Sequence, residues 1–180
     1  MAKVLIVYIA SLIAGLSAVA LYLLCFQLKS AKNIIICRLF SSLLYVVQFL
    51  LLFAFVGAAM DTAAVVMSLL AYNKDKPFIN KYKMPILIVT CVAIAAIGLL
   101  LYENVFSLLP IVGVLLEGVS NWMKNEKMIR IVSLFAIPCW FTYNIVTRAY
   151  GAAIGSVFAL ISVVSALIRY SEKPKKKELQ

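Results

Sequence analysis

The chain has 180 residues, of which 65% are apolar and 13% are charged, and its mean hydropathy is +1.05. A soluble domain is typically about 45–50% apolar and about 25% charged, so a water-soluble globule of this composition lacks the polar groups to cover its surface. The composition therefore excludes a soluble domain, a disordered chain, a collagen and a disulfide scaffold, and it indicates an all-α integral membrane protein.

The residue types that are missing exclude several kinds of chemistry. The chain has no histidine, which removes His-ligated zinc, bis-His haem and Ser/His proteolysis. The cysteines lie in or beside apolar stretches without CxxC spacing, so we interpret them as small buried hydrophobic residues: Cys25, Cys37, Cys91 and Cys139. Because no nucleophile–base pair and no metal-ligand set is found, we expect no enzyme activity, no cofactor and no metal.

Seven apolar stretches predict seven transmembrane helices, since about 20 residues cross the hydrocarbon layer. They cover residues 4–26, 34–55, 57–72, 86–102, 106–121, 128–148 and 151–170. The third and the fifth are short for a bilayer. The first also resembles a signal peptide, because Lys3 and an apolar run precede four small residues at 17–20. That run continues through Leu24 without a polar region, which favours a retained helix.

The basic residues predict the orientation of these helices, because Lys and Arg collect in cytoplasmic loops. If the seven helices alternate in direction, 15 of the 17 basic residues fall on one side of the membrane: Lys29, Lys32, Arg38, Lys74, Lys76, Lys81, Lys83, Lys124, Lys127, Arg130, Arg169, Lys173, Lys175, Lys176 and Lys177. Only Lys3 and Arg148 fall on the other. We expect the N-terminus outside and the C-terminus in the cytoplasm. The net charge of +10 is thus an orientation signal, and no nucleic-acid partner is expected.

An internal repeat divides the predicted helices into two units. Gly57-Ala58-Ala59 matches Gly151-Ala152-Ala153 at an offset of 94, and a Val-Val-x-x-Leu motif recurs from Val65 to Val163 at an offset of 98. We predict a first three-helix unit at 4–72, a linker helix at 86–102, a second three-helix unit at 106–170 and a basic cytoplasmic tail at 171–180. One linker helix leaves both units pointing the same way, which makes a parallel repeat.

Polar side chains inside the predicted helices are the candidate binding residues. An acid at the bilayer centre costs about 2.5–3.5 kcal/mol, so such residues are commonly retained for function. The candidates for substrate binding are Gln48, Asp61, Glu117, Trp140, Tyr143 and Asn144. Two interpretations stay open for them: a pocket for a small polar molecule, in which a carboxylate also carries a coupling proton, and hydrogen bonds that tie helices together.

Two further residues are candidates for gating. Arg148 is the only charge near the outer end of its helix, and we predict that it pairs with Asp61 across the two units as part of an outer gate. Pro138 removes a backbone hydrogen bond to Leu134 and predicts a kink, which serves either as a hinge or as a packing feature.

Several motifs resemble one known family. They are Trp122-x-x-x-Asn125-Glu126-Lys127-x-Ile129-Arg130, Trp140-x-x-Tyr143-Asn144, Tyr150-Gly151, the lysine-rich first loop and the Gly57-Ala58-Ala59 turn. Together they resemble the YgjV-type family of bacterial inner membrane proteins over most of the chain, which implies an inner-membrane location. The three-plus-one-plus-three layout is more distantly similar to the SWEET and PQ-loop transporters. Those carry prolines in both units, whereas this chain has Pro110 and Pro138 in the second unit only.

Two functions fit these features. The first is a small secondary transporter or permease that moves a small polar metabolite by rocking one unit against the other. The second is a non-transporting assembly or accessory protein whose polar residues serve helix packing. The expected partners are the lipid bilayer and, for the first function, that metabolite; a homodimer stays open. A chamber between the two units that contains Gln48, Asp61, Glu117 and Asn144 would favour transport.

Overall fold

The computed structural model describes the backbone of residues 2–171 and the side chains of residues 6–169. Within this range the chain forms helices and connecting turns, without a strand. The elements in chain order are α1 (Ala2–Gln27), α2 (Ala31–Leu51), α3 (Phe55–Tyr72), α4 (Pro77–Lys81), α5 (Lys83–Leu100), the 3₁₀ helix η1 (Val105–Ser107), α6 (Leu108–Asn121), α7 (Glu126–Val146) and α8 (Tyr150–Ser171). The predicted basic tail lies outside the described residues, apart from Ser171 at the end of α8.

The predicted all-α membrane architecture is confirmed. All seven expected helices are present, and their ends differ from the prediction by about four residues at most. Among the described residues, six helices are long and apolar enough to cross a membrane. The seventh segment, Val105–Asn121, is shorter and joins η1 to α6. Hydropathy does not predict α4, a five-residue helix that starts at Pro77, where the missing N–H group costs nothing.

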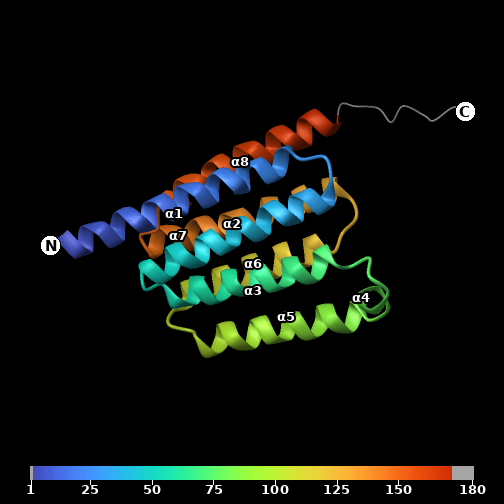
Figure 1. The fold of residues 1–180 in the computed structure, drawn as a ribbon, viewed down its shortest axis with the longest axis horizontal. Helices are drawn as coiled ribbons and strands as arrows, with labels where there is room; N and C mark the ends of the chain where they lie inside the picture. Colours follow the sequence, from blue (N-terminus) through green and yellow to red (C-terminus); the bar gives the residue numbers. More distant parts are fainter. Residues whose placement is uncertain (1, 172–180) are drawn as a thin grey trace, which may run out of the picture.

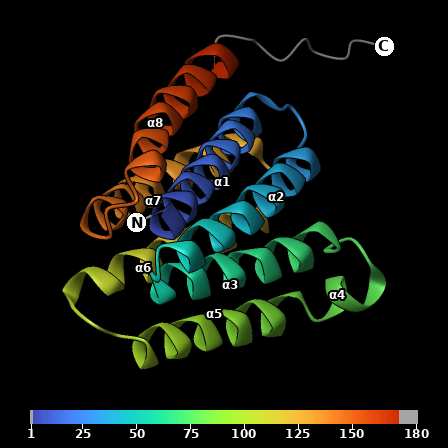
Figure 2. The same ribbon diagram turned by 60° about the vertical axis from the view of Figure 1, so that its left-hand side comes forward.

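Six of the helices form two layers of three (Figures 1 and 2). One layer contains α1, α2 and α3, and the other contains α6, α7 and α8. Between the layers, α1 packs against α8 and α3 packs against α6. In the middle α2 and α7 face each other, and the ring of Phe49 stacks on that of Trp140 with centroids 6.4 Å apart. The first helix of one layer thus packs against the last helix of the other, which is the arrangement that a two-fold axis parallel to the helices would produce.

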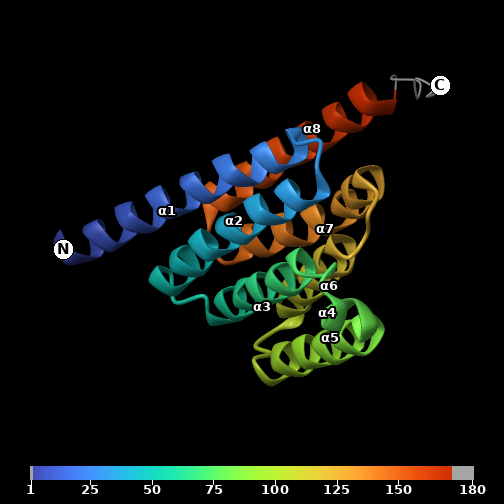
Figure 3. The same ribbon diagram turned by 45° about the vertical axis from the view of Figure 1, so that its right-hand side comes forward.

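Helix α5 lies outside the two layers and packs against α3 and α6 (Figure 3). Its other faces are exposed and apolar; Val89 is 67% exposed and Leu100 is 85% exposed. Such a surface is stable only against lipid or another apolar partner. The position of α5 beside the layers is the one expected of a linker helix, and the division of the chain into two units and a linker stays a prediction.

The two ends of the bundle differ in charge. The connections from α1 to α2, from α3 to α5 and from α6 to α7 lie at one end, together with the C-terminus of α8 (Figure 1). We call this the basic end, because these connections hold the lysines between residues 29 and 127. The opposite end is called the turn end, because the tight α2–α3 and α7–α8 turns lie there. The basic side chains thus segregate as the alternating helices predict, while the membrane face that each end meets stays a prediction.

The α2–α3 and α7–α8 turns have the same backbone structure. Phe53 and Arg148 adopt left-handed φ values of 57° and 59°. The next residue in each turn donates its N–H back to the helix: Ala54 to Phe49 O at 2.9 Å and Ala149 to Asn144 O at 2.8 Å. These bonds form matching Schellman caps. Equivalent positions in the turns are therefore 95 residues apart, so the predicted offset of 94 is wrong by one residue.

Candidate functional site

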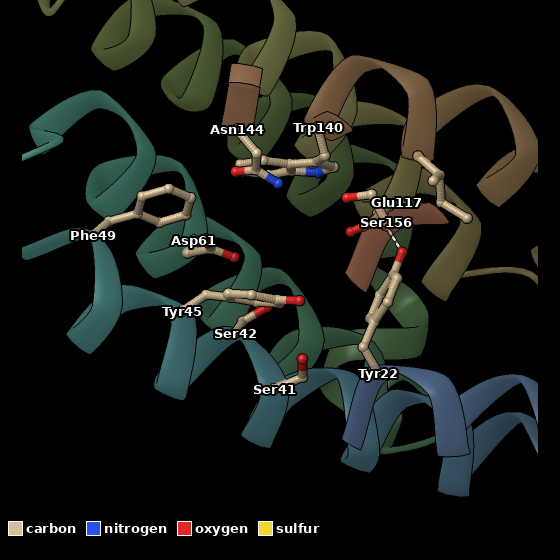
Figure 4. Close-up of a pocket in the computed structure, with 11 residues that line it drawn as sticks. Tyr22, Ser41, Ser42, Tyr45, Phe49, Asp61, Glu117, Trp140, Asn144 and Ser156 are labelled. Carbon is tan, nitrogen blue, oxygen red and sulfur yellow. Dashed lines mark hydrogen bonds between the residues drawn. The ribbon is translucent and has the colours of Figure 1, made fainter. Parts of the chain in front are cut away.

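A small internal cavity lies between the two layers at their centre (Figure 4). Its volume is about 40 Å³, which is room for about three water molecules. We call it the central chamber. Its lining comes from all six layered helices and none from α5: Tyr22 of α1; Ser41, Ser42, Tyr45 and Phe49 of α2; Asp61 of α3; Glu117 of α6; Ile137, Trp140 and Asn144 of α7; and Ser156 of α8.

The lining residues are related by the 95-residue register of the turns. Ten of the eleven form five pairs at this separation: Tyr22 with Glu117, Ser42 with Ile137, Tyr45 with Trp140, Phe49 with Asn144, and Asp61 with Ser156. The register equates α1 with α6, α2 with α7 and α3 with α8, as the packing of the layers does. The chamber therefore lies where the predicted two-fold axis would pass between the layers. The paired positions carry unlike side chains, so its two halves differ chemically.

Two carboxylates face the chamber. Asp61 is 5% exposed and interacts with the Ser42 hydroxyl. Glu117 accepts a hydrogen bond at Oε1 from the Tyr22 hydroxyl. Among the described residues, no basic side chain lies within ion-pair distance of either carboxylate. The ion pair found among the described residues is remote, joining Lys32 Nζ to Asp75 Oδ2 at 3.1 Å.

The structure brings four of the six predicted binding residues together. Asp61, Glu117, Trp140 and Asn144 all line the chamber. Gln48 does not; its amide is buried nearer the turn end, where only the missing side chain of Gly15 leaves room for it. Sequence reasoning placed Gln48 in the pocket, but its neighbour Phe49 occupies that position because the helix turns by about 100° per residue.

Tyr143 also lies outside the chamber wall, at the turn end. Its hydroxyl accepts a hydrogen bond of 2.9 Å from the backbone N–H of Gly57. Its ring lies 6.0 Å from that of Phe49 and 6.4 Å from that of Trp140, centroid to centroid. A second hollow of about 200 Å³ lies at the turn end, and Tyr143 lines it. Tyr143 therefore borders this hollow and also packs near two aromatic rings of the chamber wall.

The two predicted gating residues lie away from the chamber. Arg148 is exposed in the α7–α8 turn, and no ion pair joins it to the buried Asp61 within the described part of the chain. The expected Arg148–Asp61 pair is thus not formed, because Asp61 faces inward between the layers. Pro138 is exposed on α7, and the helix continues through it from Glu126 to Val146. A gating role for Arg148 or Pro138 stays a prediction.

Sequence reasoning missed most of the lining on α1 and α2. Tyr22, Ser42, Tyr45 and Phe49 are embedded in apolar stretches, where nothing local distinguishes them from packing residues. The signal that could have found them is the register of 95, since it pairs Tyr22 with Glu117 and Tyr45 with Trp140. The same register finds Ser156 from Asp61.

Three buried basic side chains close the basic end, and we call them the basic latch: Arg38, Lys74 and Arg130. Each joins one layer to the other. Arg130 Nη2 donates to Leu28 O at 2.9 Å, and Lys74 Nζ donates to Asn121 O at 3.0 Å and to Met123 O at 2.9 Å. Burial lowers the pKa of the Lys74 amine, with the neighbouring lysines acting in the same direction.

Arg38 makes the most extensive contacts of the latch. Its Nη1 donates to Ser120 Oγ at 3.0 Å and to Asn121 Oδ1 at 2.7 Å, and its Nη2 donates to Ser133 Oγ at 2.6 Å. At the turn end the described side chains form one hydrogen bond between the layers, from Gly57 to Tyr143. The polar contacts that hold the layers together are therefore concentrated at the basic end.

Comparison with known proteins agrees with this architecture. The model of a family described as bacterial inner membrane protein, YgjV type, matches residues 8–174. No curated protein and no solved structure matches the chain. The match extends over nearly all of the helices, and together with their apolar surfaces it identifies a multi-pass protein of the inner membrane. The chain therefore belongs to the YgjV family of bacterial inner membrane proteins.

Proposed function

We propose that this protein is a small carrier that moves a small polar solute across the inner membrane. The observation that carries the proposal is the central chamber, which lies between the two layers and receives side chains from all six layered helices. Transporters built from two parallel repeats bind their solute between the repeats. A carboxylate is costly within the bilayer, and the location of both Asp61 and Glu117 on one cavity, rather than in solid packing, supports a binding role.

The unequal closure of the two ends supports alternating access. The basic latch holds the layers together at one end through charged donors, whereas the Tyr143 ring and its bond to Gly57 close the other. In the orientation that the lysines predict, the basic end faces the cytoplasm. Rocking of α1–α3 against α6–α8 would then break the latch as the turn end closes. Asp61 and Glu117 are the groups that would carry a coupling proton in this cycle.

Cysteine accessibility tests this proposal without knowledge of the solute. In a chain whose four native cysteines are replaced by Ala or Ser, Ser42→Cys places a single thiol in the chamber. We expect a membrane-impermeant maleimide to label it both in right-side-out and in inside-out vesicles, because each face opens in turn. Ser165→Cys on the exposed surface of α8 is the matched control for background labelling.

The labelling pattern separates the two functions. Labelling of Ser42→Cys from both faces, with the control unlabelled, supports a carrier. Labelling from one face alone, or from neither while the protein keeps its thermal unfolding temperature, contradicts it. That result would favour the accessory role, in which the polar residues serve packing.

A further inference from the structure

We propose that the solute of the central chamber is a small cation rich in N–H donors, of the ammonium or guanidinium type. This inference rests on the proposed carrier function, because it names the class of solute that the carrier moves. It is argued from three properties of the lining: its hydrogen-bonding capacity, its charge and its aromatic rings.

The chamber offers acceptors more than donors. The hydroxyl hydrogens of three lining residues are already used: Tyr22 donates to Glu117, Ser41 donates to Ala18 O at 2.8 Å, and Ser156 donates to Ala152 O at 3.0 Å. Their oxygens keep free lone pairs. The lining also holds donors, on Tyr45, Trp140 and Asn144, but its acceptors are more numerous because they include both carboxylates, the Asn144 amide oxygen and the hydroxyl oxygens. The lining therefore matches a donor-rich ligand better than an anion.

Asn144 provides an independent indication of a missing donor. It is 4% exposed and its side chain lies at the chamber wall beside Trp140 (Figure 4). Its amide oxygen Oδ1 is buried without a hydrogen-bond partner. A buried polar atom in this state is unfavourable, so such atoms are normally satisfied by a ligand, by water or by the protein. An N–H group of a bound cation would satisfy it.

The charge of the lining also favours a cation over an anion. Asp61 and Glu117 bring two acidic groups into the chamber, while none of the described Lys and Arg side chains lines its wall. No described basic side chain lies within ion-pair distance of Asp61. The charged form of a buried carboxylate is strongly unfavourable without a counter-ion. A cation next to Asp61 stabilises that charged form, whereas an anionic solute would destabilise it.

Aromatic rings complete the site and set its size. Tyr45 and Trp140 occupy equivalent positions on α2 and α7, and the Trp140 indole lies close to Gly113, where a Cβ atom would be 2.8 Å from its Nε1. Ring faces attract cations. The volume of about 40 Å³ admits a few non-hydrogen atoms, which is the size of methylammonium or guanidinium.

Equilibrium binding to the purified full-length protein in lipid nanodiscs tests the inference. The probes are guanidinium chloride and methylammonium chloride at millimolar concentration, each compared with a neutral molecule of similar shape, urea and methanol respectively. We expect saturable binding of at least one cation by calorimetry and none of its neutral counterpart. Asp61→Asn should weaken that binding about tenfold or more, because the cation loses its charged partner.

Two variants keep the test interpretable. Asp75→Asn makes the same chemical change at an exposed carboxylate outside the chamber and should leave binding unchanged. Asn144→Leu removes the unpartnered oxygen with little change in volume; it should fold as well as the native protein and bind the cation more weakly. If Asp61→Asn fails to fold, cation binding by Asn144→Leu tests the inference instead.

The outcomes separate this inference from the carrier function. Cation binding that is lost in Asp61→Asn or Asn144→Leu supports the inference, even if Ser42→Cys is labelled from one face only. Equal binding of charged and neutral probes, binding that neither variant changes, or no binding of either cation overturns it. Labelling of Ser42→Cys from both faces would in that case still support a carrier, with a solute of another class.

Discussion

Arg38 is the residue whose surroundings differ most from what its place in the sequence indicates. It follows the lysines of the first basic loop, where a solvated side chain is expected, but it is 2% exposed. Its guanidinium joins α2 to α6 and α7 because the fork of N–H groups reaches Ser120, Asn121 and Ser133 at once. Lysine has one nitrogen and no fork, so charge alone does not replace this geometry.

Arg38→Lys should therefore lower the free energy of unfolding by about 1–3 kcal/mol, because hydrogen bonds between the layers are lost while the charge stays buried. Chemical unfolding in mixed micelles measures the change. Arg169→Lys, at an exposed arginine of α8, is the matched control and should have no effect. Equal stability of the two variants would show that the fork contributes nothing.

The same variant reports on the basic latch. A weakened latch opens the basic end more often, so the chamber thiol of Ser42→Cys should react faster from that face when Arg38→Lys is added. The measurement is the maleimide labelling rate in vesicles of each orientation. An unchanged rate from the basic end would argue that the latch does not limit access.

At the residue scale, the sequence revealed the polar residues within the helices better than it revealed which residues line the chamber. Asp61, Glu117 and Asn144 were recognisable because polar groups are rare in apolar helices. Gln48 was recognisable for the same reason, yet it packs against Gly15. Which face of α2 meets the chamber depends on the packing of six helices, and a nearly uniform apolar helix does not reveal its orientation.

At the scale of elements, hydropathy predicted every long helix but not the register between the two layers. Gly57-Ala58-Ala59 and Gly151-Ala152-Ala153 are identical in sequence and lie 94 residues apart. The structurally equivalent left-handed residues of the two turns are Phe53 and Arg148, which lie 95 residues apart. A left-handed residue is normally glycine or asparagine. Because neither turn uses one, the sequence does not mark where each helix ends, and the alignment of small residues is one position out.

Arg148→Gly should stabilise the protein by about 1 kcal/mol relative to Arg148→Ala. Both variants remove the side chain, but only glycine relieves the left-handed strain at φ 59°. Thermal unfolding in one detergent compares them. Equal unfolding temperatures would mean that the turn relaxes without cost when alanine occupies this position.

At the scale of the whole molecule, the segregation of charge is the feature that the sequence predicted most directly. The structure places the basic connections at one end of the bundle (Figure 1). An odd number of crossings follows if the short segment Val105–Asn121 also spans the membrane. This segment decides the topology, because without it the ends of α7 and α8 would exchange sides.

Single cysteines at exposed positions of the two ends test the orientation. Glu103→Cys at the turn end should react with an impermeant maleimide in intact cells, and Lys124→Cys at the basic end should react only after the membrane is made permeable. The two sites flank Val105–Asn121, so their accessibility from the same face would show that this segment does not cross.

The unlike partners across the chamber have a consequence for how a guest sits there. If both halves were identical, a molecule on the dyad would have two equivalent poses, one turned by half a revolution from the other. Asp61 is matched by Ser156 in the other half, and Tyr22 is matched by Glu117, so the two poses are not equivalent. A molecule held by this wall therefore has one preferred orientation about the dyad.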